Sequence, residues 1–312
     1  MSIGHRYTPT VVLAALFAFV AVGIAGTYRY VDNYWVYRGF APPRDPTYVH
    51  VRGTTQRLYV ASPALGGRRQ PVDVYLPPGY ASHRARRYPV LYLLHGVPGR
   101  PAAFLDTVRM GVVEDELVAR RKARAMILVM PFGSTGSFTD KEWANGVRPH
   151  EGWETFVARD LVRAIDARYR TVRSAAGRAL GGLSEGGYGA LNIGIHHPGE
   201  FRVLESWSGY QRADPVRAVF GSTNNGATLA RNSPYITLPQ QAAKLRRDHV
   251  RFWFYTGTGD PLKRQNAAFA AELRGLRLPF TYSAVRGGHN WALWRGNAAR
   301  AYLAASRGLR GP

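Results

Sequence analysis

The sequence predicts an α/β domain whose core is a mostly parallel, doubly wound sheet with helices on both faces. Two observations lead to this prediction. Short, continuous apolar runs, typical of strands buried on both faces of a parallel sheet, alternate along the chain with helical patterns. A glycine-rich stretch, residues 178–190, has the pattern of a tight turn between a buried strand and a helix. The chain of 312 residues is 46% hydrophobic and 20% charged, which is the composition of a globular protein.

Residues 10–27 form an uncharged apolar run of 18 residues, preceded by a short N-terminal flank at 1–9. This length is just sufficient for a helix to cross a bilayer. The residues that follow resemble a membrane-interface belt and favour a retained transmembrane anchor: Tyr28, Tyr30, Tyr34, Trp35 and Tyr37. A cleaved signal peptide is the alternative, with small residues at 23–25 as the cleavage site. The flanking charges do not decide the orientation, but both interpretations place the rest of the chain outside the cytoplasmic membrane.

Residues 28–46 are predicted to be a linker, because Pro42, Pro43 and Pro46 cannot continue a helix and favour extended structure. A single α/β domain is predicted for residues 47–312. It begins with short strands at 49–51, 57–61 and 72–76, and a Gly-Gly turn at 66–67 separates candidate hairpin partners.

Two continuous apolar runs, 88–94 and 125–130, are predicted to be buried parallel strands with a helix at 111–121 between them. From Trp153 to Tyr169, apolar residues recur at helical spacing, which predicts an amphipathic helix. The remaining elements alternate: a strand and helix within 178–197, strands at 203–207, 250–255 and 280–285, and helices at 261–276 and 291–303.

The segment Gly182–Gly186 has the pattern G-x-S-x-G, which occurs nowhere else in the sequence. In this pattern a serine lies on a strained strand-to-helix turn, which lifts its hydroxyl above the sheet. Side chains two positions before and after the serine would collide, and glycine removes the collision. The pattern therefore indicates Ser184 as a nucleophile, provided that a base, an acid and oxyanion donors accompany it.

Among the histidines that follow Ser184, His289 is the predicted base. It comes directly after the last predicted strand, in a glycine-rich loop that can bring an imidazole to the edge of the sheet near the serine. The other three have simpler interpretations. His196 and His197 lie at a helix end before a proline, where capping is expected, and His249 precedes a strand in a surface loop.

Asp260 is the predicted acid, because it alone among the downstream carboxylates directly follows the C-terminal end of a buried strand, where functional groups of open α/β sheets gather. The alternative is a helix N-cap, with Pro261 at the first helical position. We expect that one carboxylate does not easily fill both roles. The other acids available by chain order are Glu200, Glu205, Asp214, Asp248 and Glu272.

Two backbone N–H groups are needed to stabilise an oxyanion. One is expected from Glu185, directly after the serine, and the other from the loop after Leu94, at Val97. His95 precedes the serine in the chain, and we expect it to shape this loop rather than to act as the base.

The sequence resembles the esterase D family of α/β-hydrolases, which includes feruloyl and acetyl esterases, S-formylglutathione hydrolases and mycolyltransferases. The resemblance runs from about Val49 to the C-terminus, with its motifs in the family's order: 62–66, 74–80, 88–96, 153–156, 182–190 and 288–291. It implies an α/β-hydrolase fold, with Ser184, Asp260 and His289 as the catalytic residues and Val97 and Glu185 as oxyanion donors.

Two departures from the family pattern bear on the substrate. The residue after the serine is often methionine in this family and is Glu185 here, and a carboxylate beside the pocket is expected to repel anionic acyl groups. The cysteine of the formylglutathione hydrolases is missing, since the chain contains no cysteine, which argues against that substrate.

The net charge of +22 is interpreted as an arginine-rich, solvated surface rather than as a nucleic-acid site, because the arginines are spread along the chain and no nucleic-acid motif accompanies them. The absence of cysteine excludes disulfides and thiolate zinc sites. No metal, cofactor or nucleic-acid partner is predicted.

The predicted function is that of a serine carboxylic-ester hydrolase that acts through an acyl-enzyme on a small-molecule, glycolipid or sugar ester, with membrane attachment through residues 10–27. One alternative is an acyltransferase of the mycolyltransferase type, in which a sugar hydroxyl replaces water. Another is a non-catalytic envelope protein that keeps the fold for binding. The intact order of serine, acid and histidine argues against that last alternative. The sequence predicts no oligomeric state.

Overall fold

The structure is a computed structural model that describes residues 9–136, 139–222 and 225–310. The chain divides into two compact units, Met1–Pro42 and Pro43–Pro312. The first unit contains helix α1 (Pro9–Tyr37), whose side chains are largely exposed. Among the described residues α1 is the one helix that is long and apolar enough to cross a membrane, a property that it shares with signal sequences. Residues 1–8 of the predicted N-terminal flank lie outside the described residues.

Helix α1 extends beyond the predicted apolar run and includes residues 28–37, which the sequence assigns to the linker. No proline or glycine interrupts these residues, so their aromatic side chains do not end the helix. The helical hydrogen bonding ends near Gly39, which has a φ of 82°, and Pro42 and Pro43 follow.

The second unit is built on one eight-stranded sheet, with the strand order β1-β2-β4-β3-β5-β6-β7-β8. Strands β3 to β8 run parallel to their neighbours, while β1 and β2 form an antiparallel hairpin whose β2 pairs antiparallel with β4. The predicted mostly parallel sheet is therefore confirmed. The strands are β1 (Thr54–Ser62), β2 (Arg68–Leu76), β3 (Val90–Leu94), β4 (Ile127–Pro131), β5 (Arg178–Leu183), β6 (Val203–Trp207), β7 (Arg251–Gly257) and β8 (Phe280–Val285).

The hairpin forms as predicted, with Gly66 and Gly67 after the short helix η1 (Pro63–Leu65) and a positive φ at both glycines. The strand predicted at 49–51 is not formed, and these residues are in irregular structure. Val49 is buried although it lies outside the sheet, so its apolar character reflects packing rather than strand pairing.

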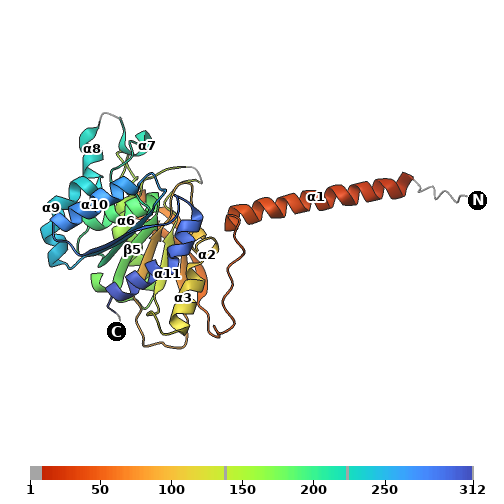
Figure 1. Cartoon of the computed structure of the whole chain (residues 1–312), viewed down its shortest axis with the longest axis horizontal. Helices are drawn as coiled ribbons and strands as arrows, with labels where there is room; N and C mark the ends of the chain where they lie inside the picture. The colour runs from red at the N-terminus through yellow and green to blue at the C-terminus, as the bar shows by residue number, and fades with distance from the viewer. Residues whose placement is uncertain (1–8, 137–138, 223–224, 311–312) are drawn as a thin grey trace, which may run out of the picture. The chain divides into compact units, whose positions relative to one another are not determined.

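Helices cover both faces of the sheet (Figure 1). One hydrophobic cluster joins the sheet to the segment Trp153–Arg168, to α6 and to α9 and α10, and a second joins the opposite face to α2, α3 and α11. The segment 153–168 is one continuous helical run with a π-helical middle. The helices are α2 (Ala103–Asp106), α3 (Met110–Ala119), α4 (Trp153–Thr155), η2 (Phe156–Leu161, π-helical), α5 (Val162–Arg168), η3 (Ala175–Gly177), α6 (Glu185–His196), α7 (Arg217–Phe220), α8 (Gly226–Arg231), α9 (Pro234–Arg247), α10 (Lys263–Gly275) and α11 (Trp291–Gly308).

The connection between β6 and β7 contains three helices that the sequence analysis does not predict: α7, α8 and α9. The longest, α9, has Pro234 at its start, where a proline is tolerated, and a second proline, Pro239, inside it. Its apolar residues Leu238, Ala242 and Leu245 nonetheless repeat at helical spacing and are buried against the sheet.

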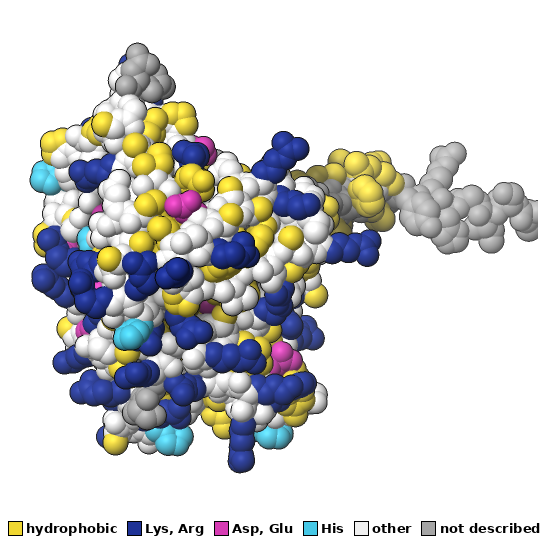
Figure 2. Space-filling view, turned by 60° about the vertical axis from the view of Figure 1, so that its left-hand side comes forward, with side chains coloured by type: hydrophobic (Ala, Val, Ile, Leu, Met, Phe, Trp, Pro, Cys, Tyr) yellow, Lys and Arg dark blue, Asp and Glu magenta, His cyan; other side chains and the backbone are white. Residues whose placement is uncertain are grey.

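Figure 2 shows Lys and Arg side chains scattered over the visible face of the molecule, with few Asp or Glu side chains among them. This distribution agrees with the interpretation of the +22 charge as a solvated arginine-rich surface.

Candidate active site

Ser184 lies between the end of β5 and the start of α6, with φ 55° and ψ −125°. A non-glycine residue with this backbone conformation is strained, as a nucleophile elbow requires. The turn is held in place because the Ser184 N–H donates to the Trp207 carbonyl oxygen at 3.0 Å, which ties it to the end of β6.

The two glycines of the pattern are needed because backbone groups pack tightly around the elbow. A Cβ atom at Gly186 would overlap the carbonyl oxygen of Leu94, and one at Gly182 would overlap the carbonyl oxygen of Gly186. Gly96, in the loop after β3, approaches the serine closely, and a Cβ there would lie 3.0 Å from the Cβ of Ser184. Glycine is therefore required at positions 182 and 186, whereas a side chain at position 96 would need its neighbours to shift slightly.

The structure brings Ser184, His289 and Asp260 together in one hydrogen-bonded relay. The Ser184 hydroxyl lies 2.9 Å from His289 Nε2, and His289 Nδ1 lies 2.9 Å from Asp260 Oδ2. The Asp260 side chain is fully buried and that of His289 is 28% exposed. The His289 ring also packs edge-on against Trp294, whose indole N–H donates to the Trp207 carbonyl oxygen at 3.2 Å.

The two carboxylate oxygens of Asp260 have different partners, and neither partner is in the first turn of α10. Its Oδ2 contacts His289 Nδ1, while its Oδ1 accepts the Leu262 N–H at 2.8 Å. Helix α10 starts at Lys263, later than the predicted Pro261, so Asp260 stabilises the turn before the helix rather than its first turn. Each carboxylate oxygen has its own donor, and the two roles do not compete.

The loops that carry Asp260 and His289 are joined through their backbones. The Thr258 N–H donates to the Val285 carbonyl oxygen at 2.7 Å, and the Gly259 N–H donates to the Gly287 carbonyl oxygen at 2.9 Å. Gly257 approaches the Gly287 backbone so closely that a Cβ would overlap the carbonyl oxygen. These contacts fix the separation of the acid and the imidazole.

The predicted oxyanion donors belong to two segments that are close to the serine. Glu185 is the first residue of α6, where backbone N–H groups have no intrahelical partner and the helix dipole favours negative charge. Val97 is 41% exposed and follows Gly96, whose backbone packs against Ser184. Both N–H groups therefore belong to segments that border the nucleophile.

His95 supports this loop through two hydrogen bonds. Its Nε2 accepts the Gly133 N–H at 3.1 Å, which assigns the ring proton to Nδ1, 2.9 Å from the Gly96 carbonyl oxygen. Burial lowers the His95 pKa to about 4, so the ring is neutral near pH 7. The neutral ring fixes the loop next to the elbow, in line with the predicted shaping role.

A model of the esterase family matches residues 62–303, which make up most of the chain. The chain belongs to the esterase family. It is 36% identical over 159 residues to Esterase Rv1288 of Mycobacterium tuberculosis. The matched region covers 51% of this chain and 32% of that relative. It is 30% identical over 197 residues to the diacylglycerol acyltransferase/mycolyltransferase Ag85B of Mycobacterium leprae. This matched region covers 52% of this chain and 56% of that relative.

These matches span about a third to about half of the length of the two relatives. A solved structure of a ferulic acid esterase superposes with a TM-score of 0.72 at 24% identity, over 83% of this chain and 99% of that one. This likeness establishes the α/β-hydrolase fold.

In this member of the esterase family the Glu185 side chain is buried, which changes its expected effect on the substrate. Burial raises its pKa well above 4.5, and the nearby charges of Asp140 and Glu142 raise it further. A raised pKa favours the neutral carboxyl group, which weakens the predicted repulsion of anionic acyl groups.

Next to Glu185 the structure places two residues that sequence reasoning missed, Glu142 and Tyr210. Glu142 is buried and accepts the Tyr210 hydroxyl at 2.7 Å, and the Tyr210 ring stacks on Tyr188 with centroids 4.5 Å apart. Burial, followed by the charge of Asp140, raises the Glu142 pKa to about 9. No sequence pattern connects positions 142 and 210, because their contact arises from the folding of two separate loops.

The other candidate histidines are not in the relay. His196 Nδ1 and His197 Nε2 lie 3.0 and 2.9 Å from the two oxygens of buried Glu154 in α4. His197 is also the C-cap residue of α6, and its N–H donates to the Ile193 carbonyl oxygen. His249 lies in the turn after α9 with a φ of 54°. Within the described ranges, no group of three or more His, Cys, Asp or Glu side chains is arranged to hold a metal ion.

Proposed function

We propose that the chain is a serine carboxylic-ester hydrolase that works through an acyl-enzyme, with Ser184 as nucleophile, His289 as base and Asp260 as acid. The observation that carries the proposal is the unbroken relay, with 2.9 Å at each of its two links. The strained backbone of Ser184 and membership of the esterase family support it. A protein that used the fold for binding alone would have no need of this relay.

In the proposed mechanism the Ser184 oxygen attacks the ester carbonyl while His289 Nε2 accepts the serine proton. Asp260 holds Nδ1–H and stabilises the imidazolium that forms. The negative charge on the carbonyl oxygen is stabilised by the Val97 and Glu185 N–H groups. The imidazolium then protonates the leaving alcohol, and a water molecule activated by His289 hydrolyses the acyl-enzyme.

Labelling with a fluorophosphonate probe tests the nucleophile. We expect the wild-type chain to be labelled on Ser184 and the Ser184→Ala variant to lose the label, while a Ser82→Ala control, at an exposed serine far along the chain from the elbow, keeps it. Labelling that persists in Ser184→Ala would overturn the assignment.

An acyltransferase that passes the acyl group to a sugar hydroxyl is the second candidate, favoured by the similarity to the Mycobacterium leprae acyltransferase/mycolyltransferase. Both candidates share the acyl-enzyme and differ in the acceptor. Esters with acyl chains of different lengths, assayed with and without a sugar acceptor, separate them. Hydrolysis that does not change on adding sugar supports the hydrolase, whereas an acylated sugar as the main product supports the transferase.

We also propose that residues 10–27 anchor the chain in the membrane, with residues 28–46 as the connection and the catalytic domain, residues 47–312, outside the cytoplasmic membrane. The exposed apolar side chains of α1 and the division of the chain after Pro42 support this arrangement. The full chain, expressed in bacteria, should sediment with membranes, and deletion through Arg44 should give a soluble, active enzyme. Mature protein that begins near Gly26 in the medium would show a cleaved signal peptide instead.

A further inference from the structure

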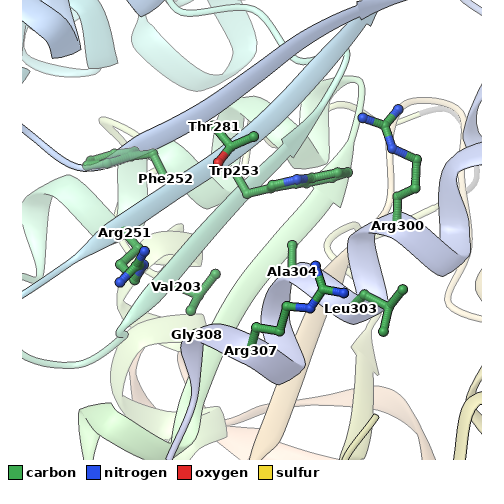
Figure 3. A pocket seen from close by; sticks show the side chains of 10 residues that line it. All are labelled: Val203, Arg251, Phe252, Trp253, Thr281, Arg300, Leu303, Ala304, Arg307 and Gly308. Atoms are coloured by element: carbon green, nitrogen blue, oxygen red, sulfur yellow. The ribbon is translucent and has the colours of Figure 1, made fainter. Parts of the chain in front are cut away.

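A basic groove lies near the N-terminal ends of the parallel strands, whereas the candidate active site lies at their C-terminal ends. It has a volume of about 420 Å³, within the range of small-ligand sites, and runs between α11 and strands β7 and β8 (Figure 3). Its lining includes Arg251 and Val203, at the starts of β7 and β6, whereas Ser184 follows the C-terminal end of β5. We call it the Trp253 groove after the indole at its centre.

The groove exists because α11 does not cover β8, the strand at the lateral edge of the sheet. Strand β8 is the last strand, and each of its six residues keeps some exposure. Trp253 and Leu303 are packed only partly against the hydrophobic cluster beneath α11. The indole ring and the side chain of Thr281 therefore lie open on the floor, with arginines along the rim (Figure 3).

The arginines of the groove lack acidic partners among the described residues. Arg251 and Arg307 form no ion pair there, and Arg300 bonds only to neutral groups, Asn297 Oδ1 at 2.8 Å and Ser283 Oγ at 3.1 Å. Two buried acids lie against α11, Glu205 and Glu114, and burial raises the pKa of both, to about 8 for Glu205. A raised pKa favours the neutral form, so these two groups offset little of the arginine charge.

More positive charge lies at the Arg251 end of the groove. Arg202 has a buried Nε without a hydrogen-bond partner. Its pKa is lowered by burial and then by the neighbouring charges of Arg310 and Arg251. Like charges packed together in this way repel one another, and a bound anion relieves the repulsion.

The spacing of the charges defines the ligand. Arg300 and Arg307 are seven positions apart on one helix, which separates them by about 10 Å along its axis. A single phosphate or carboxylate does not span this distance, but a ring with an anionic group at each end does. Arginine recognises such groups through paired N–H donors, and the flat indole face of Trp253 offers an apolar surface for the ring.

We propose that the Trp253 groove binds a saccharide that carries phosphate or carboxylate groups. The hydroxyl of Thr281 suits the hydroxyls of a sugar, and the ten lining residues include no Asn or Gln to read a nucleobase edge. The proposal does not rest on the proposed ester hydrolysis, because the groove and the serine lie at opposite ends of the parallel strands.

Isothermal titration of the full chain in detergent with fructose 1,6-bisphosphate tests the proposal. We expect saturable binding that weakens at least tenfold in R300Q/R307Q. The matched control R163Q/R217Q removes two exposed arginines elsewhere and should change the affinity by less than twofold. Turnover of a soluble ester should stay within twofold of wild type in both variants, so failure of this proposal is distinct from failure of the hydrolase assignment.

Comparison probes identify what the groove recognises. Fructose should not bind, because it lacks the anionic groups, and pyrophosphate should bind at least tenfold more weakly, because it lacks the ring. Equal binding of pyrophosphate, equal losses in the two double variants, or no binding of the bisphosphate would overturn the proposal. Tighter binding of ADP than of the sugar bisphosphate would replace it with a nucleotide site.

Discussion

Replacing Asp260 by asparagine separates the role of this residue in catalysis from its role in the turn before α10. The two oxygens serve different partners, with Leu262 N at 2.8 Å from Oδ1 and His289 Nδ1 at 2.9 Å from Oδ2. Asparagine has one oxygen and one NH₂ group in place of the two oxygens. If the amide oxygen keeps the Leu262 N–H, the NH₂ group faces His289 Nδ1.

The NH₂ group must then donate to Nδ1, which forces the imidazole proton onto Nε2. That nitrogen points at the Ser184 hydroxyl, and with a proton in place it no longer accepts the proton of the serine. Flipping the amide would restore the tautomer but would set two donors against each other at the Leu262 N–H. We therefore expect kcat to fall on the order of 10⁴-fold, a barrier increase of about 5 kcal/mol.

The assay is ester turnover together with thermal melting. The melting temperature should stay near that of the wild type, because the amide oxygen preserves the Leu262 hydrogen bond. An Asp248→Asn control, at a carboxylate after α9, should retain wild-type turnover. The catalytic role is falsified if Asp260→Asn keeps more than about a tenth of the wild-type kcat, a barrier change of only about 1.4 kcal/mol.

Two further predictions concern buried carboxylates. The Glu142 pKa is raised from 4.5 to about 9, so its stabilising effect is complete below pH 4.5 and is lost as the pH rises toward 9. Between pH 5 and pH 9 the melting temperature of Glu142→Gln should therefore fall by less than that of the wild type. Parallel plots of melting temperature against pH for the two proteins would contradict this. Glu154 behaves oppositely: burial raises its pKa, but the hydrogen bonds from His196 and His197 outweigh burial and lower the pKa to about 2. Its stabilisation is present above pH 4.5 and lost as the pH falls toward 2, so Glu154→Gln should cost about 1–3 kcal/mol at pH 7 in chemical denaturation, with a deficit that shrinks below pH 4. An equal deficit at both pH values would refute the ionic contribution.

The fold was largely predictable because its strands are short apolar runs between clear breaks. Strands β6 and β8 have the predicted bounds, and β3, β4 and β7 differ from them by one or two residues at most of their ends. Helix α9 was not predicted, because its two prolines argue against a helix in the sequence, and its apolar face is identified only from its packing on the sheet. The residues at 49–51 show the opposite case, since they form no strand and only Val49 among them is buried.

The relay was predictable because chain order and the ends of the strands determine which side chains meet at the C-terminal ends of the parallel strands. The surroundings of Glu185 were not, because its pKa is raised by burial and then by Asp140 and Glu142, which lie on a loop far earlier in the chain. Local pattern also did not show that Asp260 serves two partners, since that depends on the position of each carboxylate oxygen.

The backbone hydrogen bonds between the loops after β7 and β8 have a consequence for how this domain can be recombined with its relatives. Thr258 and Gly259 donate to Val285 and Gly287, so neither loop keeps its shape when the other is replaced by a sequence of different length. A chimera that exchanges one loop alone would separate the acid from the imidazole. The smallest unit that keeps both loops together is the whole stretch from Gly257 to His289, including α10 and β8.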